Sequence, residues 1–587
     1  MAHTWNLNDL YKGFDENYVH DMDTLESLVD LKIERLKAIG TEDDRTLLEN
    51  ILEIDMKLTV MSRSLASFAS LTMATDVTHP EAPKHLARLQ AIFRKSTKDD
   101  VRFQRHLKTL DLDALAVTSP IIKENLYMLK REASEADHLL SEDEELLYSG
   151  LRELASSGWS QLQGILTSQL EVDFRGKTIT LPEVRNLAYD DDQSVRKDAF
   201  DAEIKASSQI EDAVALGLSN IKREVLLMSK MRGYESPLDK TLFQSRMSKA
   251  SLDAMIGAMK DARPHFERYL KAKAAYLGHK GSLPFHDLFA PVGKSSGTYT
   301  YEQAQGIITE AFGGFSDRLA NFAKKAFELE WIDVEPRKGK RGGAFCSNQP
   351  QIRQSRILSN FTGSLSDVLT LAHELGHGYH GEVISDNPPL AWSYPMPLAE
   401  TASIFCEAIV NNNLLSKVTD DAVKLSVLEN ALQGDTQVII DILSRYVFET
   451  ALFEVATGPV SKHQLKKMME DAQKEAYGEG LDHDALHPYM WLNKPHYYSA
   501  GLNFYNFPYA FGLLFGKGLY ALYQDNPESF VKRYDTLLAA TTRADVEDVA
   551  RTMGIDVTDR AFWDASLSVI IKDIDTVTAL FESLSAA

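Results

Sequence analysis

Helical periodicity is the feature that most limits how this chain of 587 residues can fold. In residues 44–74, apolar side chains recur at the three- and four-residue spacing of an amphipathic helix, and the stretch contains neither Gly nor Pro. Residues 300–303 have the sequence of a capping box, which would begin another helix. The sequence therefore predicts a mainly α fold, with further helical patterns in residues 21–39, 141–172, 191–232, 247–277, 301–329, 421–457 and 526–548.

Strand patterns are few and short. Residues 170–174 and 177–181 flank an Arg-Gly pair and predict a two-stranded hairpin. Residues 342–347 and 356–361 predict two further strands on either side of a polar turn. The rest of the chain is expected to consist of helices and their connections.

The length of the chain predicts two or more structural units, because a single hydrophobic core rarely extends beyond about 250–300 residues. Breaks that carry Pro and Gly occur near residues 118–120, 176–182, 280–297 and 336–350. We expect a helical N-terminal domain in residues 1–190 and a larger catalytic domain in residues 191–587, which holds the His-Glu-Leu-Gly-His segment described below.

The charge and cysteine content narrow the range of partners and compartments. A net charge of −22 disfavours nucleic acid, because phosphate binding needs clustered Lys and Arg. The only cysteines, Cys346 and Cys406, exclude a disulfide framework and a Cys-based zinc finger, and fit a reducing compartment. We expect a cytoplasmic protein, since the sequence has no signal-peptide pattern and no membrane-length apolar run. The oligomeric state is not indicated.

The segment 373–377, His-Glu-Leu-Gly-His, carries the strongest chemical signal. Two His residues four apart share one face of a helix, so that His373 and His377 can bind the same tetrahedral zinc ion. Glu374 projects beside that face, where it can accept a proton from a zinc-activated water as general base. Ser364 or Ser366 can cap the helix, and the nearby glycines at 376 and 378 suggest a closely packed neighbouring backbone.

Such a zinc site needs a third protein ligand. The extended motif of this class would place a His at position 383, where this chain has Val383. Glu400, which is 23 residues after His377, is the predicted third ligand, and Glu407 is a candidate contact for a ligand His. A solvated helix face is the alternative interpretation of these two carboxylates. We expect one zinc ion per chain.

Three motifs in this order resemble the oligoendopeptidase F branch of the thimet-oligopeptidase-like zinc metallopeptidases. The first is the opening Trp5–Tyr11, and the second is residues 372–377 together with Glu400 and Ser403. The third is the C-terminal pair of segments 495–498 and 504–512. The resemblance covers most of the chain.

The resemblance implies a two-lobed, mostly helical enzyme with a small β element beside the zinc-site helix and a deep substrate channel. It also implies cleavage of internal bonds in short peptides, with the N-terminal domain forming one wall of the channel. By motif, His496, Tyr505 and Tyr509 are expected to stabilise the developing oxyanion, and Tyr498 to bind substrate.

The pair Gly342-Gly343 beside a predicted strand suggests a second substrate contact. An edge strand there could pair with a peptide backbone, which makes Gly343 and Ala344 candidate substrate-binding residues. Two alternatives to a zinc endopeptidase stay open. One is a peptide-binding protein without activity, against which the intact Glu374 argues. The other is an exopeptidase such as a carboxypeptidase.

Overall fold

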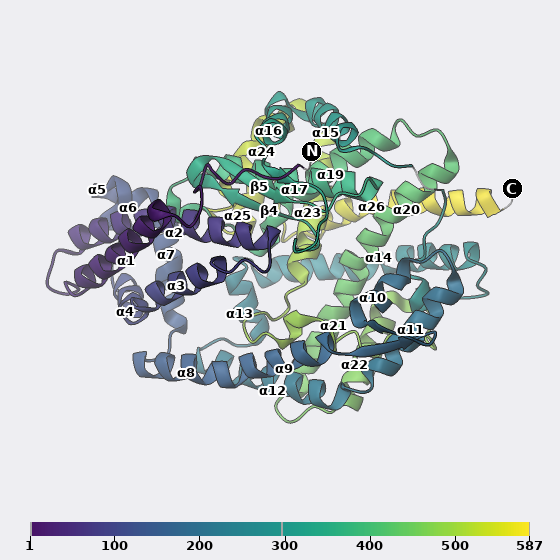
Figure 1. The fold of residues 1–587 in the computed structure, drawn as a ribbon, viewed down its shortest axis with the longest axis horizontal. Coiled ribbons are helices and arrows are strands. Elements are labelled where there is room, and N and C mark those ends of the chain that lie inside the picture. The colour runs from purple at the N-terminus through teal and green to yellow at the C-terminus, as the bar shows by residue number, and fades with distance from the viewer. Residues whose placement is uncertain (1–2, 295–296, 586–587) are drawn as a thin grey trace. The chain divides into compact units, whose positions relative to one another are not determined.

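The computed structural model describes residues 3–294 and 297–585 and is mainly helical, as predicted (Figure 1). The chain divides into two compact units, each built from three segments. Unit 1 consists of Met1–Glu142, Gly297–Leu414 and Leu522–Gly554, and unit 2 of Asp143–Ser296, Leu415–Ala521 and Ile555–Ala587. The position expected to divide the chain, near residue 190, lies inside unit 2, and the proposed functional division stays a prediction.

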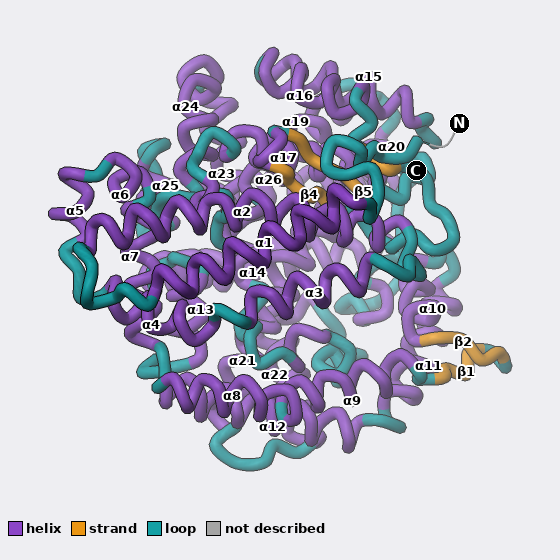
Figure 2. The backbone as a smooth tube through the Cα atoms, turned by 60° about the vertical axis from the view of Figure 1, so that its left-hand side comes forward, coloured by secondary structure: helices purple, strands orange, loops and turns teal. Residues whose placement is uncertain are grey.

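Unit 1 begins with paired helices α1 and α2. The long helix predicted for residues 44–74 is α2, and its first turn is capped by Asp43, whose carboxylate accepts from the Thr46 main-chain N–H. Along its whole length α2 buries aliphatic side chains against α1 and its neighbours (Figure 2). The helices that lie mainly in unit 1 are α1 (Glu16–Leu36), α2 (Asp44–Thr75), α3 (Ala82–Arg94), α4 (Thr97–Leu107), α5 (Leu112–Thr118), α6 (Pro120–Glu124), α7 (Leu126–Glu135), α15 (Tyr301–Phe315), α16 (Asp317–Glu328), α17 (Leu365–Ile384), α18 (Met396–Ala399), α19 (Thr401–Leu415), α24 (Pro527–Ala540) and α25 (Val546–Arg551).

A three-stranded sheet accompanies these helices in the order β3-β5-β4, with bounds Ile332–Asp333, Gln354–Leu358 and Phe345–Gln349. Strand β3 runs parallel to β5, and β4 runs antiparallel to β5 with Phe345 opposite Leu358. The two predicted strands are confirmed, each with bounds shifted by two or three residues. The sheet packs against α17, which carries the HELGH segment.

The N-terminal segment covers the outer edge of β3. The Asn6 N–H donates to the Glu330 carbonyl at 2.8 Å, and the His3 carbonyl accepts from the Val334 N–H at 2.9 Å. Trp5 packs its ring against Phe345, with ring centroids 6.2 Å apart. The remaining long edge of the sheet is therefore the outer side of β4.

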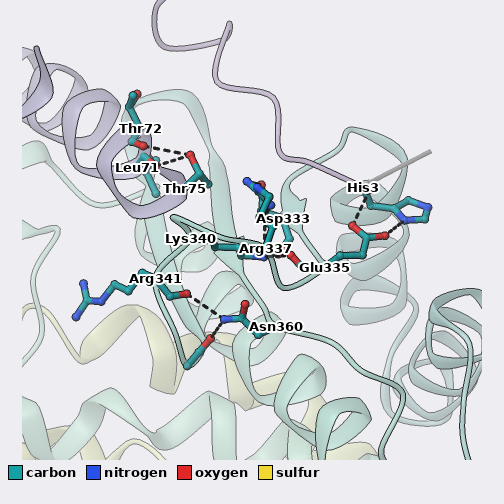
Figure 3. Close-up of polar contacts among 11 residues, drawn as sticks. His3, Leu71, Thr72, Thr75, Asp333, Glu335, Arg337, Lys340, Arg341 and Asn360 are labelled. Atoms are coloured by element: carbon teal, nitrogen blue, oxygen red, sulfur yellow. Dashed lines mark hydrogen bonds and ion pairs between the residues drawn. The ribbon is translucent and has the colours of Figure 1, made fainter. Parts of the chain in front are cut away.

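The connection between β3 and β4 carries the basic run at 337–341, and ion pairs hold it in place (Figure 3). Arg337 donates two hydrogen bonds to the Asp333 carboxylate, at 2.5 and 2.9 Å. The side chain of Lys340 is fully buried, and its ammonium lies 2.7 Å from the same carboxylate. The Arg341 N–H donates to a carbonyl in the last turn of α2. These contacts fix the loop that leads into β4.

Unit 2 is helical apart from the predicted hairpin, which is formed by β1 (Glu171–Phe174) and β2 (Lys177–Thr180) (Figure 2). The helix predicted for residues 421–457 is interrupted by a π-helical turn at Gln437–Asp441, a geometry that pattern alone does not reveal. Its helices are α8 (Glu142–Leu154), α9 (Ser156–Ser168), α10 (Leu181–Asn186), α11 (Gln193–Ser207), α12 (Glu211–Met231), α13 (Pro237–Gln244), α14 (Lys249–Tyr276), α20 (Asp421–Thr436), α21 (Ile442–Val455), α22 (Lys462–Tyr477), most of α23 (Phe507–Asp525) and α26 (Arg560–Ser585).

None of the helices in residues 3–294 and 297–585 combines the length and the apolar character needed to span a bilayer. Cys346 and Cys406 are both free thiols.

Candidate metal centre

The start of α17 is fixed by a capping box. Ser364 is the N-cap and its hydroxyl accepts from the Asp367 N–H, as one of the two predicted caps. The Asp367 carboxylate accepts in return from the main-chain N–H groups of Thr362, Gly363 and Ser364 at 2.9–3.0 Å. Three such bonds at the positive end of a helix make the first turn rigid. The two His residues that follow are therefore carried on a firmly anchored element.

Glycines allow α17 to approach its neighbours closely. A Cβ on Gly376 would lie 2.6 Å from the Ala402 carbonyl and from the Ser403 Cα, both in α19. The backbone contact suggested by these glycines is thus present at position 376. At Gly378 the neighbours are instead the Phe322 ring and the Ser355 hydroxyl. The close contact at Gly376 places the start of α19, and with it Glu400, beside the His pair.

His373, His377 and Glu400 converge, so that one donor atom from each lies within 4.8 Å of the other two. Glu400 Oε2 is 3.1 Å from His373 Nε2 and 3.4 Å from His377 Nε2. Bonds of 2.0–2.1 Å to a tetrahedral zinc ion separate ligand atoms by about 3.3 Å, so these distances fit such an ion. Within the described residues no other cluster of His, Cys, Asp and Glu has this arrangement.

Two neighbouring side chains orient the donors. Glu407 Oε2 lies 3.2 Å from His373 Nδ1, so this ring nitrogen donates to Glu407 and Nε2 is the atom left to bind a metal beside Glu400. Ser403 donates its hydroxyl to Glu400 Oε2 at 2.9 Å. Glu407 therefore lies next to a predicted ligand His, and its role stays a prediction.

The charges of the three predicted metal ligands, His373, His377 and Glu400, reinforce one another. Burial by itself lowers the pKa of His373, but its hydrogen bonds to Glu400 and Glu407 raise that pKa to about 10. Burial raises the pKa of Glu400, yet the hydrogen bonds from His373 and His377 outweigh it and hold that pKa well below its usual range. A site that stabilises charge in this way suits a bound cation, which would take the place of the imidazole protons.

Glu374 lies beside the donor group and is not one of its members. Its side chain is only 6% exposed. Burial raises the pKa of Glu374, against the opposing influence of His377 and His373. A buried carboxylate with a raised pKa next to a cation site is well suited to accept and return a proton.

His380, the third His of α17, is packed in the core. It is fully buried, its Nε2 lies 2.8 Å from the Thr541 hydroxyl, and its ring stacks on Tyr394 with centroids 4.2 Å apart. Burial lowers the pKa of His380 to about 3, which keeps the ring neutral at pH 7.

Asn348 of β4 contacts α17, the helix that carries His373 and His377, and sequence reasoning missed this residue. Its side-chain amide donates to the His377 main-chain carbonyl at 3.0 Å, and its oxygen accepts from the Ser355 hydroxyl at 2.8 Å. A Cβ on Gly381 would lie only 2.2 Å from this amide group, so the glycine makes room for it. The hydrogen bond links strand and helix across 29 residues of sequence, a distance at which no local pattern gives a signal.

The predicted substrate contacts at the entrance to β4 form an ordered turn. Gly343 has a φ of +79°, and its carbonyl accepts from the Asn360 side-chain amide at 2.7 Å (Figure 3). Ala344 follows directly and leads into the strand. Apart from its chain neighbours, no described residue has an atom within 4 Å of the position where Gly343 would carry a Cβ.

The predicted aromatic residues of the C-terminal segment also come together, within unit 2. The hydroxyls of Tyr505 and Tyr509 lie 2.6 Å apart, and the Tyr505 ring lies against His496 with centroids 5.5 Å apart. Tyr498 differs, because it is fully buried and donates to the Trp491 carbonyl. That environment favours a packing role for Tyr498, and the substrate-binding role of this residue stays a prediction.

The hydrogen bonds around His496 define which of its ring nitrogens carries the proton. Arg445 can only donate, so the Asn506 side-chain oxygen must face it at 2.9 Å. The Asn506 amide nitrogen then donates to His496 Nε2 at 3.0 Å. Burial, followed by the charge of Arg445, lowers the pKa of His496 to about 3. The ring is therefore neutral at pH 7 and carries its proton on Nδ1.

A His-His-Glu donor group beside a second, buried carboxylate defines a candidate metallohydrolase centre. The chain belongs to peptidase family M3, since the model of that family matches residues 186–569. It is accordingly an enzyme that cleaves peptide bonds.

Individual relatives agree with this assignment. The oligopeptidase PepF of Bacillus subtilis is 25% identical over 464 residues, which cover 77% of this chain and 68% of that protein. A crystal structure of a proposed peptidase from Chlamydophila abortus matches with a TM-score of 0.82 and 20% identity over 98% of each chain. The oligoendopeptidase F of Enterococcus faecium matches with a TM-score of 0.73 and 18% identity, over 97% of this chain and 99% of that one. The two structures show that the fold is shared.

Proposed function

We propose that this peptidase is a zinc-dependent endopeptidase that cleaves internal bonds of short, unstructured peptides. The observation that carries the proposal is the convergence of His373, His377 and Glu400 at the spacing of three ligands of one zinc ion. When bound, zinc would supply a Lewis acid that acidifies a water molecule and polarises a carbonyl group.

The other roles belong to side chains of the protein. Glu374 accepts the proton of the attacking water and passes it to the leaving amine. Glu407 keeps the His373 ring in the orientation that presents Nε2. In the proposal, the Nδ1–H of His496 or a hydroxyl of Tyr505 or Tyr509 donates to the developing oxyanion.

The outer edge of β4 is the proposed place for the substrate backbone. Ile357 and Ser359 direct their N–H groups toward β3, so the alternating residues of β5 face β4. In the register of the pair, Phe345 and Ser347 face β5, and Cys346 directs its backbone outward. A peptide paired there would be held through its main chain, which permits many sequences. Gly343 and Ala344 would border its path.

The substrates are proposed to be short because the family resemblance places a channel over the metal. A channel admits an extended chain and excludes a folded domain.

A cytoplasmic location, expected from the two free cysteines, is also part of the proposal.

The test uses one peptide in two forms, with free ends and with both ends blocked by acetyl and amide groups. Mass spectrometry of the products should show the same internal cleavage in both forms, and elemental analysis should give one zinc per chain. Removal of single residues from the free-ended form alone would identify an exopeptidase instead. Binding of both forms without cleavage by the zinc-loaded protein would identify a peptide-binding protein. A folded protein that contains the same segment should resist cleavage.

A further inference from the structure

Unit 2 contains a cavity of about 360 Å³, and none of the residues assigned to the proposed reaction lines it. Its walls come from α10, α11, the segment 285–289 and the loop 487–494. The volume is within the range of about 300–1,000 Å³ that is typical of small-molecule sites.

Aromatic side chains form much of the lining. Tyr189 and Phe289 contact each other with ring centroids 5.0 Å apart, and Phe200 lies 6.1 Å from Phe285. Met490 adds a flexible apolar surface. These walls favour a ligand with an apolar or planar body.

Among the charged side chains at the cavity, there is one positive charge more than the negative charges can neutralise. Arg196 is neutralised by Asp287, with 2.8 Å between Nε and Oδ1. Glu203 lies 3.8 Å from Arg185 and 3.4 Å from His487, so that this carboxylate is already engaged. The remaining charge belongs to Lys494.

Lys494 forms neither a hydrogen bond nor an ion pair through its ammonium group with any residue that the structure describes. Burial, followed by the charge of Arg445, lowers the pKa of this ammonium to about 8. A shielded cation without a partner is costly, and an anion bound beside it would offset that cost.

We infer that this cavity binds a small organic monocarboxylate with an apolar body, whose carboxylate pairs with Lys494 while its body contacts Phe200 and Phe285. A single carboxylate matches the single surplus cation. A dianion such as a phosphate monoester would be repelled by Glu203, which lies in the same wall. The inference is independent of the proposed metal chemistry.

The probe is N-acetyl-L-phenylalanine, compared with its uncharged amide, and binding to the full chain is measured by isothermal titration calorimetry. The wild type should bind one acid per chain and should bind the amide at least about tenfold more weakly, because the amide forms no ion pair. Lys494→Met should weaken binding of the acid by about tenfold or more and leave the amide unchanged. Lys177→Met, a change at an exposed lysine of unit 2, is the matched control and should bind as the wild type does.

Hydrogen exchange of the wild-type chain provides a second measurement that needs no variant. The acid should slow exchange in residues 184–203 and 485–494. Three results would overturn the inference. They are the absence of saturable binding, equal binding of acid and amide, and protection confined to the metal segment at 365–407.

Discussion

Asn348 donates a hydrogen bond to the main-chain carbonyl of the predicted ligand His377, and thereby joins the edge strand β4 to the metal helix α17. The predicted metal ligands on α17 and the proposed substrate-binding strand β4 are therefore held in a fixed position relative to each other. A residue with this position would affect the reaction without touching the metal.

Asn348→Ala is expected to lower kcat/KM by about tenfold while the zinc content stays at one per chain, because the ring ligands remain and only the strand loses its attachment. Asn348→Asp should be worse, since a carboxylate would face the His377 carbonyl. The measurements are steady-state kinetics and elemental analysis. Asn17→Ala, at an exposed position of α1, is the control. Wild-type kinetics in both Asn348 variants would remove this residue from the proposed site.

Glu374→Gln is expected to keep the zinc and to lose about 10²–10⁴-fold in kcat, because the general base is removed and the three ligands remain. Glu400→Ala should instead weaken zinc binding, which a competition titration with a chelator would measure. Glu382→Gln, on the same helix, serves as the control for a change of charge. A Glu374→Gln enzyme with most of the wild-type rate would contradict the assigned mechanism.

Gly376→Ala is expected to destabilise unit 1 by about 1–3 kcal/mol, because its Cβ would lie 2.6 Å from backbone atoms of α19. The same displacement would move Glu400 and lower the affinity for zinc. Gly306→Ala in α15 is the matched change, since a Cβ there meets no atom within 4 Å. That variant should be more stable by up to about 1 kcal/mol. Thermal unfolding and zinc titration of the two proteins would decide, and equal behaviour would argue against a tight contact at Gly376.

In the aromatic segment, Tyr505→Phe, Tyr509→Phe and His496→Ala each remove one candidate donor. At least one should lower kcat more than it raises KM, with a loss of about 2.7–4 kcal/mol in transition-state stabilisation. Asn506→Ala tests the tautomer, because His496 Nε2 would lose the N–H that keeps its proton on Nδ1. Unchanged kinetics in all three donor variants would assign the segment to packing.

A carboxylate cluster in unit 1 gives a prediction for pH. Lys32 lies 2.8 Å from both Asp55 and Asp100, and burial, followed by the charge of Asp55, raises the pKa of nearby Glu132 from 4.5 to about 7. Between these two pH values the folded state binds more protons than the unfolded chain, so this group lowers the free energy of unfolding as pH rises from 4.5 to 7.

Glu132→Gln, which resembles the protonated form, should therefore raise the free energy of unfolding at pH 8 by on the order of 1–2 kcal/mol and change little at about pH 4. The expected gain in the free energy of unfolding is smaller than the full pKa shift would give, because the Glu132 side chain is partly exposed. Thermal unfolding at both pH values measures the effect. Glu53→Gln, at an exposed position of α2, should show no such difference. A Glu132→Gln variant that is less stable than the wild type at the higher pH would contradict the sign.

Short-range patterns were sufficient for much of the fold and of the candidate site. The cap at Ser364, the His pair and the capping box at Thr300 each depend on residues a few positions apart, for which helix geometry fixes the outcome. Glu400 could be proposed because a loop and a second helix fit the intervening length. The same local rules place the hairpin at residues 171–180.

Other features depend on contacts between distant segments, and no local pattern encodes them. Asn348 reaches His377 across 29 residues, and Tyr379 donates to Asp535 across 156. The π-helical turn at Gln437–Asp441 interrupts a sequence with ordinary helical periodicity. The composition of each unit from three separate segments also follows from long-range packing rather than from breaks in composition.

The interleaving of the segments has a consequence for biosynthesis. Helix α17 contacts Asp535 through Tyr379 and Thr541 through His380, so its packing partners leave the ribosome 156 and 161 residues later. At about 5–20 residues per second, the segment that carries the metal donors must wait for many seconds before its surroundings exist. A fragment that ends at residue 414 would contain His373, His377 and Glu400 and still lack α24, one of the helices against which α17 packs. The nascent chain therefore completes the packing around α17 only late in translation.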